Sequence, residues 1–355
     1  MHDMRRTKPR LGFIGLGRIG QKRMQSVLDS DAAEIVAVAD PDGACLAQVR
    51  AALPRAVVCR DIDALLEENL DGLVIATPNA LHGAQAIAAL EAGVAVFCQK
   101  PLAATAGQAR VIVDHARRND RLLGVDLSYR YLYGMQRIKQ LMSEGALGDV
   151  YALQLSFHNA FGPDKPWFYR RESAGGGCVL DLGVHLIDLA LWVFDYPVVE
   201  RVTGRCYAGG ELLPADDGRL NELPVEDYAS LQLVLANGAT VDISCSWHLP
   251  LGRSADIQAE FYGTRGGAGV RNVAGSFFDF RSELHDGCTT QVLYEPAQEG
   301  PWSGRAIVGW ARQLAADGRF DAASEGVVVV AEAIDAIYAT RDTAPVIRRS
   351  PALVS

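Results

Sequence analysis

Short apolar segments alternate with longer amphipathic segments over the first 127 residues of the chain. The short segments are nearly continuous in hydrophobic residues, as expected of strands buried on both faces of a parallel sheet. They lie at residues 10–14, 34–39, 72–76, 94–98 and 122–127. Segments between them, such as 80–92 and 104–118, have the periodicity of surface helices. The alternation predicts a doubly wound α/β sheet, in which ligands bind beyond the carboxyl ends of the strands.

The pattern changes after residue 127, where apolar and polar positions alternate along several segments. Segments 228–235 and 239–247 flank Asn237-Gly238, a strong signal for a β-hairpin. Further strands are predicted at 151–158, 255–263 and 291–294, and helices at 179–194 and 326–340. This region predicts an α+β domain with a large, mainly antiparallel open sheet. One sheet face would be covered by helices, and the other would be solvated or paired with another subunit.

The overall composition is that of a soluble globular protein, with 49% hydrophobic and 22% charged residues. A chain of 355 residues is too long for one ordinary core, so we expect two domains, at 1–127 and 128–355. No apolar run approaches 18 residues, which argues against a membrane span. The net charge of −9, without a basic block, argues against nucleic acid as a partner.

The seven cysteines are scattered without a CxxC pair, so we expect them to be reduced. Arg5-Arg6 resembles the start of a twin-arginine export signal. However, the first predicted strand follows directly, and Arg18 interrupts any apolar export region. The chain is therefore predicted to be cytoplasmic, with its first eight or nine residues disordered.

A glycine-rich turn follows the first predicted strand, with Gly15, Gly17 and Gly20 in the spacing GxGxxG. The first glycine permits a tight turn, the second lets backbone amides approach a pyrophosphate, and the third lets the next helix lie close to the strand. Arg18 and Ile19 would begin that helix, whose N-terminus would face the phosphates. A purely structural glycine turn is the alternative, but the flanking strands favour a dinucleotide site.

Asp40 ends the second predicted strand, twenty residues after Gly20. Its carboxylate would accept hydrogen bonds from the adenosine ribose hydroxyls and would repel a 2′-phosphate. Pro41 and Asp42 supply no arginine that would neutralise such a phosphate. These residues predict NAD as the cofactor in preference to NADP.

Four further motifs follow predicted strands or open a helix. Thr77-Pro-Asn-Ala-Leu-His82, Gln99-Lys100-Pro101 and Tyr129-Arg130-Tyr131 follow the last three strands of the first region. Gly175-Gly-Gly-Cys-Val-Leu-Asp181-Leu-Gly-Val-His185 opens the helix at 179–194. With the glycine turn and Asp40, these motifs resemble those of the Gfo/Idh/MocA family (glucose–fructose oxidoreductase and inositol dehydrogenase) in order and spacing over nearly the whole chain.

The resemblance implies a Rossmann domain followed by an α/β domain with a large open sheet. It also implies NAD(P)-dependent redox chemistry on sugars, polyols or their derivatives, in a homodimer or homotetramer assembled through that sheet. By the same resemblance, Lys100, Asp181 and His185 are the catalytic residues. The residues that would line the cofactor's nicotinamide side are Thr77, Pro78, Asn79 and His82, with Gln99 and Lys100 beside them.

One position departs from the family pattern, because glutamate usually precedes the Lys-Pro pair and this chain has Gln99. Glutamine keeps the hydrogen-bonding capacity but lacks the charge that would support a protonated Lys100. The substitution either changes the behaviour of Lys100, changes a substrate contact or has no effect.

Oxidation of a secondary alcohol requires a base that takes the hydroxyl proton as the hydride leaves. His185 suits this role with the ordinary histidine pKa of about 6.5. Lys100 would donate to the substrate oxygen and stabilise its developing charge, or would itself take the proton. Asp181, four residues before His185 and on the same helix face, would accept from the substrate or orient the imidazole.

The Asp181 and His185 pair also has less specific interpretations. A carboxylate near a helix start is favourable by itself, and a core histidine is common. The same spacing suits a metal, but no motif supplies a third ligand, so no metal is predicted.

A loop rich in aromatic and charged residues, including Asn159, Asp164 and Lys165, precedes the glycine turn at 175–177. Such a loop suits a polyhydroxylated ligand, because rings pack on C–H faces and polar tips bind hydroxyls. An ordinary surface loop is the alternative. Arg130 would bind a substrate carboxylate or phosphate, or would tie the two domains together. The substrate candidates are therefore Arg130, His158, Trp167 and Tyr169.

Together these features predict an NAD-dependent oxidoreductase acting on a secondary alcohol of a sugar, inositol or related polyol. Two alternatives stay open. One is a catalytically silent NAD-binding regulatory or scaffold protein of the same fold. The other is a dehydrogenase of a non-sugar diol or a nucleotide-linked sugar.

Overall fold

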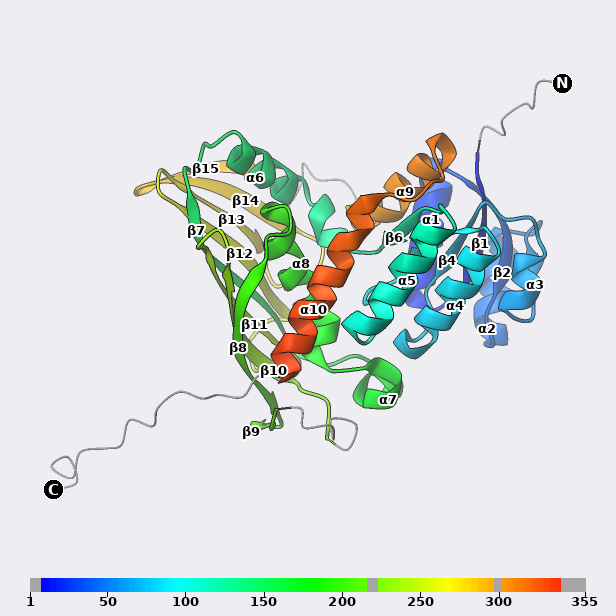
Figure 1. Ribbon diagram of the computed structural model, residues 1–355, viewed down its shortest axis with the longest axis horizontal. Helices are drawn as coiled ribbons and strands as arrows, with labels where there is room; N and C mark the ends of the chain where they lie inside the picture. The colour runs from blue at the N-terminus through cyan, green and yellow to red at the C-terminus, as the bar shows by residue number, and fades with distance from the viewer. Residues whose placement is uncertain (1–7, 216–222, 297–301, 340–355) are drawn as a thin grey trace, which may run out of the picture.

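The chain folds around two sheets that face each other across a layer of helices (Figure 1). The computed structural model describes residues 8–215, 223–296 and 302–339. The predictions for the first residues of the chain and for position 340 thus lie largely outside the described residues. The α/β class and the predicted change from a parallel to a mainly antiparallel sheet are both confirmed.

The first sheet is entirely parallel, with strand order β3-β2-β1-β4-β5-β6. Its strands are β1 (Arg10–Ile14), β2 (Glu34–Ala39), β3 (Val57–Val58), β4 (Gly72–Ile75), β5 (Ala95–Cys98) and β6 (Leu123–Val125). Leu11 and Phe13 of β1 belong to the core on one face, whereas Ile14 belongs to the core on the other. Burial on both faces explains why these strands are continuous apolar runs in the sequence.

Helices cover both faces of this sheet. The helices of this half are α1 (Arg18–Ser30), α2 (Gly43–Ala52), α3 (Ile62–Leu66), α4 (Asn79–Glu91) and α5 (Ala106–Arg118). Residues of α1 and α2 pack into one core, and residues of α3, α4 and α5 pack into the other. Thr105 caps α5 by accepting a hydrogen bond from the amide of Gln108, which fixes where that helix begins.

The second sheet has nine strands in the order β15-β14-β13-β12-β7-β11-β10-β8-β9. Neighbouring strands run antiparallel, except that β7 and β11 run parallel to each other. The strands are β7 (Val150–Asn159), β8 (Val199–Ala208), β9 (Glu211–Leu212), β10 (Tyr228–Leu235), β11 (Thr240–Ser246), β12 (Ala255–Gly263), β13 (Gly267–Asn272), β14 (Phe280–Asp286) and β15 (Thr289–Tyr294). The predicted hairpin at Asn237-Gly238 joins β10 to β11, with Gly238 at a φ of 84°.

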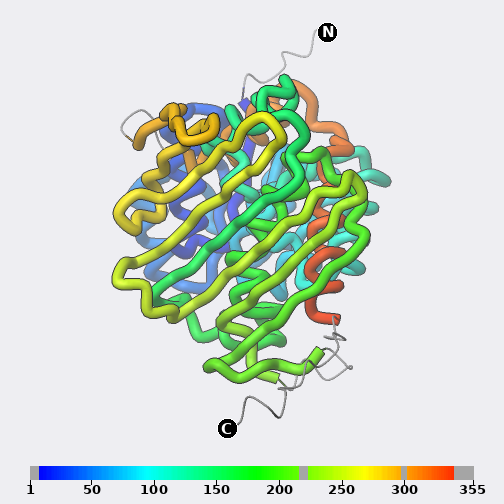
Figure 2. Tube along the Cα trace, turned by 90° about the vertical axis from the view of Figure 1, so that its left-hand side faces the viewer, coloured from blue at the N-terminus to red at the C-terminus, as the bar shows by residue number. Residues whose placement is uncertain are grey.

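Among the described residues, helices cover only the inner face of the second sheet. This layer contains η1 (Ser128–Tyr131), α6 (Tyr133–Ser143), η2 (Pro166–Tyr169), α7 (Arg171–Ala174), the π-helical turn η3 (Val179–Gly183), α8 (Val184–Val193) and α10 (Gly326–Ala339). The short helix η6 (Ala322–Glu325) precedes α10 and packs against β6 of the first sheet. In Figure 2 the outer face of the sheet is turned to the viewer, and none of the described helices crosses it. The prediction of one covered face therefore holds within the described residues.

Helix α9 (Arg305–Ala316) lies in the second half of the sequence but packs against the first sheet. The Trp310 ring lies 5.5 Å from the ring of Phe97. A Cβ atom at Gly72 would lie 2.5 Å from Trp310, and one at Gly124 would lie 2.7 Å from it. The chain thus returns to the first sheet after completing the second. A domain boundary at residue 127 therefore separates the strands of the two sheets, but it assigns α9 to the second domain although α9 packs on the first sheet.

Helix α10 joins the two halves, because it packs on α5 as well as on α8 and β8. Asp335 of α10 accepts a hydrogen bond of 2.9 Å from the first amide of α5, at Ala106. The helical stretch Arg171–Val193 is long and apolar enough to span a membrane, although no single apolar run in the sequence indicated one. It is almost completely buried within the fold, as expected of a core helix.

Candidate active site

The glycine turn has the geometry that its spacing predicts. Gly15 has a φ of 87°, and a Cβ there would lie 2.5 Å from the carbonyl of Ala76. A Cβ at Gly20 would lie 2.1 Å from the Gly15 oxygen, so packing requires the first and third glycines. Around Gly17, by contrast, a Cβ would meet no atom within 4 Å. Gly17 is the N-cap of helix α1, and Arg18 and Ile19 lie in its exposed first turn.

Asp40 stands beside this turn at the end of β2 and supports it directly. One carboxylate oxygen accepts a hydrogen bond from the amide of Leu16, and the other accepts one of 2.7 Å from the amide of Asp42. The carboxylate is therefore part of the folded turn. It remains partly exposed, which leaves room for an outside donor.

The residues after β4 connect the two halves of the molecule. Asn79 donates a hydrogen bond of 2.9 Å to the carbonyl of Ala174, just before the second glycine-rich turn. The His82 ring nitrogens lie 2.9 Å from the Thr77 carbonyl oxygen and 2.8 Å from the Pro101 carbonyl oxygen. The ring is completely buried, so His82 braces two loops. Its predicted place on the cofactor side stays a prediction.

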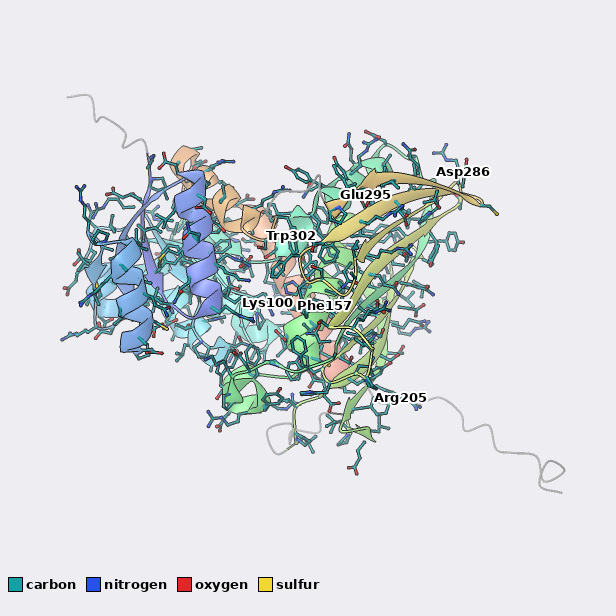
Figure 3. The ribbon with its side chains drawn as sticks, turned by 180° about the vertical axis from the view of Figure 1, so that it is seen from behind. Lys100, Phe157, Arg205, Asp286, Glu295 and Trp302 are labelled. Atoms are coloured by element: carbon teal, nitrogen blue, oxygen red, sulfur yellow. The ribbon has the colours of Figure 1, made fainter. Side chains whose placement is uncertain are left out.

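Lys100 lies between the two sheets (Figure 3) and forms an ion pair with Asp181. The ammonium of Lys100 donates to the Asp181 carboxylate and to the Asp181 backbone carbonyl, each at 2.7 Å. The second carboxylate oxygen accepts a hydrogen bond of 3.1 Å from the indole of Trp247, at the end of β11. Lys100 follows β5, and Asp181 lies in the π-helical turn η3, so residues far apart in sequence form one charged cluster.

His185 is buried next to this cluster, at the start of α8. Its ring lies 4.9 Å from the Tyr129 ring, and its Nδ1 atom has no hydrogen-bond partner in the described part of the chain. Burial, together with the positive charges of Lys100 and Arg23, lowers the pKa of His185 well below 6.5. The expectation of an ordinary pKa is therefore wrong, and the imidazole is neutral at neutral pH.

Asp181 does not orient His185 within the described structure. Its oxygens are taken by Lys100 and Trp247, and no hydrogen bond joins it to the imidazole. The predicted helix at 179–194 begins with the wider turn η3, so the assumed α-helical relation between the two residues does not apply. Such π-helical turns often occur at functional sites.

Gln99 occupies a buried polar network behind Lys100. Its side-chain amide donates to the Asp126 carboxylate, which also accepts from Arg23 and, at 2.6 Å, from Ser128. All four side chains are buried. A neutral donor at position 99 therefore complements a carboxylate that sequence reasoning did not identify.

Two of the substrate candidates are engaged elsewhere. The guanidinium of Arg130 binds both carboxylate oxygens of the buried Asp188, so it holds η1 to α8 and is not free for an anion. His158 contacts the hydroxyls of Ser244 and Ser246 at 3.0 and 2.8 Å. These residues alternate with the core-facing residues of β7 and β11, which puts His158 on the outer face of the sheet, away from Lys100.

The aromatic loop lies closer to the charged cluster. The Tyr169 ring packs edge-on against the Trp247 ring at 5.6 Å, and Tyr169 is partly exposed. Trp167 stacks on Phe168 at 3.8 Å, one step further from Asp181. The aromatic wall is thus built around Trp247. A lone tryptophan at the end of a predicted strand was the only signal for it in the sequence.

No group of three histidine, cysteine, aspartate or glutamate side chains suited to a metal ion occurs among the described residues. The described site brings together an ammonium, a carboxylate and a buried imidazole. These groups can stabilise an oxyanion and accept a proton.

Comparison with known proteins finds relatives over both halves of the chain. Residues 9–127 match the oxidoreductase family with an NAD-binding Rossmann fold, and residues 135–268 match the Gfo/Idh/MocA C-terminal domain. D-glucoside 3-dehydrogenase of Escherichia coli (strain K12) is 30% identical over 73% of this chain and 76% of its own length.

Solved structures share the fold over most of the chain. A levoglucosan dehydrogenase in complex with NADH has a TM-score of 0.78 at 21% identity, covering 93% of this chain and 95% of that one. A 3-ketoreductase from Actinomadura kijaniata in complex with NADP and TDP-benzene has a TM-score of 0.76 at 20% identity, covering 93% and 97%. Both cofactors thus occur on this fold.

Proposed function

Because the chain belongs to the Gfo/Idh/MocA family of oxidoreductases, we propose that it transfers hydride between NAD and a secondary alcohol of a sugar, inositol or related polyol. The observation that carries the proposal is the contact of Lys100 with Asp181 beside the neutral, buried His185. This cluster combines a cationic donor, a carboxylate and a proton acceptor. Alcohol oxidation needs a proton acceptor, and a cationic donor stabilises the charge that develops on the oxygen.

The residues around the glycine turn fit a dinucleotide. The open backbone at Gly17, where helix α1 begins, leaves room for a pyrophosphate at a helix N-terminus. Asp40 would hold the adenosine ribose, and its charge favours NAD over NADP. Thr77, Pro78 and Asn79 would lie on the nicotinamide side. When bound, the nicotinamide supplies the hydride acceptor or donor.

The chain's own residues manage the substrate oxygen and its proton. Lys100 donates to that oxygen, and Asp181 holds the Lys100 side chain in place. His185, kept neutral by burial, takes the hydroxyl proton during oxidation and returns it during reduction. We assign the proton to His185 because the Lys100 side chain is engaged by the Asp181 carboxylate and carbonyl, whereas His185 Nδ1 has no hydrogen-bond partner in the described part of the chain.

The exposed ring of Tyr169, which packs on the buried Trp247, supports a sugar or polyol as substrate. An exposed ring near Asp181 can pack on the C–H face of a sugar while the sugar hydroxyls reach the charged cluster. The similarity to D-glucoside 3-dehydrogenase supports the same class.

We also assign a homodimer or homotetramer contact to the outer face of the second sheet. This broad face is uncovered in the single chain, and an uncovered sheet face is a natural place for a second copy to pack (Figure 2). The cytoplasm is the compartment in keeping with seven reduced cysteines.

The test is an activity screen of the purified protein. It is incubated with NAD or NADP and a panel of sugars, inositols and glycosides while the absorbance of reduced nicotinamide is followed. NAD-dependent turnover of a polyhydroxylated substrate, lost in Lys100→Met, supports the proposal. Tight NAD binding without any turnover favours a silent regulatory protein. Turnover limited to non-sugar diols or nucleotide-linked sugars would change the substrate class.

A further inference from the structure

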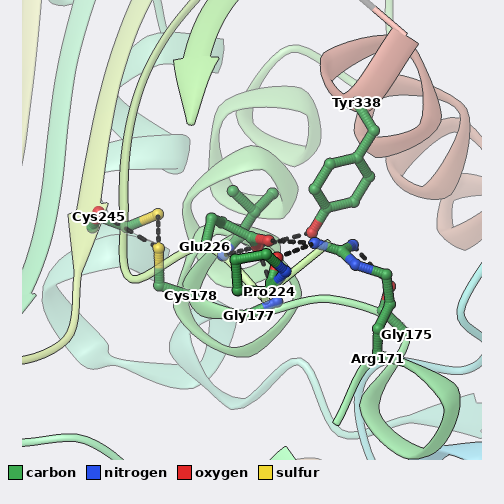
Figure 4. Close-up of polar contacts among 9 residues, drawn as sticks. Arg171, Gly175, Gly177, Cys178, Pro224, Glu226, Cys245 and Tyr338 are labelled. Carbon is green, nitrogen blue, oxygen red and sulfur yellow. Dashed lines mark hydrogen bonds and ion pairs between the residues drawn. The ribbon is translucent and has the colours of Figure 1, made fainter. Parts of the chain in front are cut away.

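Glu226 lies just before β10, and its side chain is completely buried between three elements (Figure 4). It is 45 residues away in sequence from Asp181, and no motif in the sequence indicated a role for it. A fully buried carboxylate is costly unless its oxygens are bound by several donors, so its partners indicate what it does.

Three successive backbone amides at the second glycine turn donate to this one residue. Gly177 and Val179 donate to a Glu226 carboxylate oxygen at 2.8 and 3.1 Å. Cys178, between them, donates to the Glu226 backbone carbonyl at 2.9 Å. These are the amides that a helix leaves without partners at its N-terminus, where a negative charge is also favoured.

The remaining partners of the carboxylate come from two other helices. Tyr338 of α10 donates at 2.7 Å, and Arg171 of α7 forms an ion pair at 3.3 Å. Gly177 is in such close contact that a Cβ there would lie 1.9 Å from the Glu226 carbonyl oxygen. The glycine turn therefore fits against Glu226 with no room for a side chain.

Asp181 is one turn from these anchored amides, because its own amide donates to the Gly177 carbonyl at 3.0 Å. The direction of the Asp181 carboxylate toward Lys100 is thus set by where the turn begins. We propose that Glu226 is the positioning residue of the site: through the amides of Gly177 and Val179 it holds η3 so that Asp181 meets Lys100. This inference rests on the function proposed above.

The partners of Glu226 require a carboxylate. A glutamine could accept from the two amides with its oxygen, but its NH₂ group would then face Arg171, donor against donor. Glu226→Gln is therefore expected to loosen the turn while keeping the volume of the side chain. Tyr338→Phe is the matched control, because it removes one donor to the same carboxylate and leaves the amide anchors intact.

The decisive experiment is a double-mutant cycle with Asp181→Asn, measured as kcat and KM for the best substrate. If Glu226 acts through Asp181, Glu226→Gln lowers kcat roughly 10- to 100-fold with little change in the KM for NAD. The double variant should then be no worse than about twofold below Asp181→Asn, because the two effects are not additive. A double variant whose loss equals the product of the single losses would overturn the proposal, as would wild-type kcat in Glu226→Gln.

Hydrogen exchange of the 175–183 segment gives a readout that does not require activity. In the wild type, the amides of Gly177 and Val179 should be protected like those of α8, and Glu226→Gln should speed their exchange about tenfold or more. Wild-type amides that exchange as fast as an exposed loop would contradict the anchor, even if Glu226→Gln does not fold. Absence of turnover in the wild type would count against the proposed function and would leave the exchange result to decide the anchor.

Discussion

The side-chain amide of Gln99 donates a hydrogen bond to Asp126, directly behind the lysine of the site. Arg23 binds the same carboxylate oxygen, and all three side chains are buried. Asp126 carries one negative charge and Arg23 one positive charge, and the neutral amide of Gln99 leaves the two in balance. Glutamine in place of the family's usual glutamate is thus explained by Asp126, the carboxylate just after β6, to which its amide donates.

Gln99→Glu should therefore destabilise the fold, because it puts two buried carboxylates in contact with a single arginine. We expect a loss of roughly 2–4 kcal/mol in the free energy of unfolding, measured by urea denaturation. Adding Asp126→Asn should recover most of the lost stability, because the network then again holds a single carboxylate, now at position 99. Equal stability of Gln99→Glu and wild type would contradict this account of the network.

Lys100→Met removes the donor to the substrate oxygen while keeping much of the side-chain volume. We expect kcat/KM for the alcohol to fall roughly 100- to 1000-fold, as for loss of a group that stabilises developing charge. NAD binding, measured by calorimetry, should stay within about threefold of wild type, because the glycine turn is untouched. A variant that keeps most of its activity would remove Lys100 from the chemistry.

The low pKa of His185 predicts how stability depends on pH. Its folded pKa lies well below 6.5, so the unfolded chain binds this proton more readily, and stability is lost as pH falls from 6.5 toward the folded pKa. Between pH 6.5 and 5, the free energy of unfolding should therefore fall by ~1 kcal/mol less in His185→Asn than in the wild type. Thermal or urea denaturation across this range measures the difference. Burial also lowers the pKa of His82, so part of the dependence of stability on pH should remain in both proteins.

Asp40→Ser combined with Pro41→Arg should shift the cofactor preference toward NADP. The pair removes the repulsive charge and supplies a partner for the 2′-phosphate, so the NADP:NAD ratio of kcat/KM should rise by about tenfold or more. Pro41→Arg alone is the control, because it keeps the contact of Asp40 with the Leu16 amide. An unchanged NADP:NAD ratio of kcat/KM would contradict the proposal that Asp40 determines the cofactor preference.

His158→Ala is expected to leave kcat and KM close to wild type, because this side chain contacts Ser244 and Ser246 on the outer sheet face. If that face joins two copies, the same variant should instead shift the monomer–oligomer balance in sedimentation. A large rise in the KM for the substrate, with no change in the oligomeric state, would instead indicate that His158 contacts the substrate.

The sequence pattern predicted elements best where burial is simple. Five strands of the first sheet are largely buried, and their apolar runs identify them directly. The short edge strand β3, with Val57 exposed, was not predicted. Strands β8, β13 and β14 were not predicted, because polar residues and glycines on the outer face break the alternation. Gly269 of β13 is one such case, since a Cβ there would lie 2.3 Å from the carboxylate of Glu260.

The site was predictable where a local motif carries the geometry, as in the glycine turns and at Lys100. Long-range contacts are invisible to such reasoning: Asp126, Trp247 and Glu226 reach the site through the tertiary fold. The same limit applies to Arg130, whose partner Asp188 is 58 residues away. Motif and spacing suggest candidate residues, whereas the fold shows which of them lie together and what holds them in place.

The most direct test of the central claim is a structure of the wild-type protein with NADH and the ketone of its best substrate. We predict that the oxygen on the carbon facing the nicotinamide lies within about 3.2 Å of Lys100 Nζ and of a His185 ring nitrogen. A substrate oxygen bound elsewhere, with the Lys100–Asp181 pair still closed and away from the ligand, would contradict the claim.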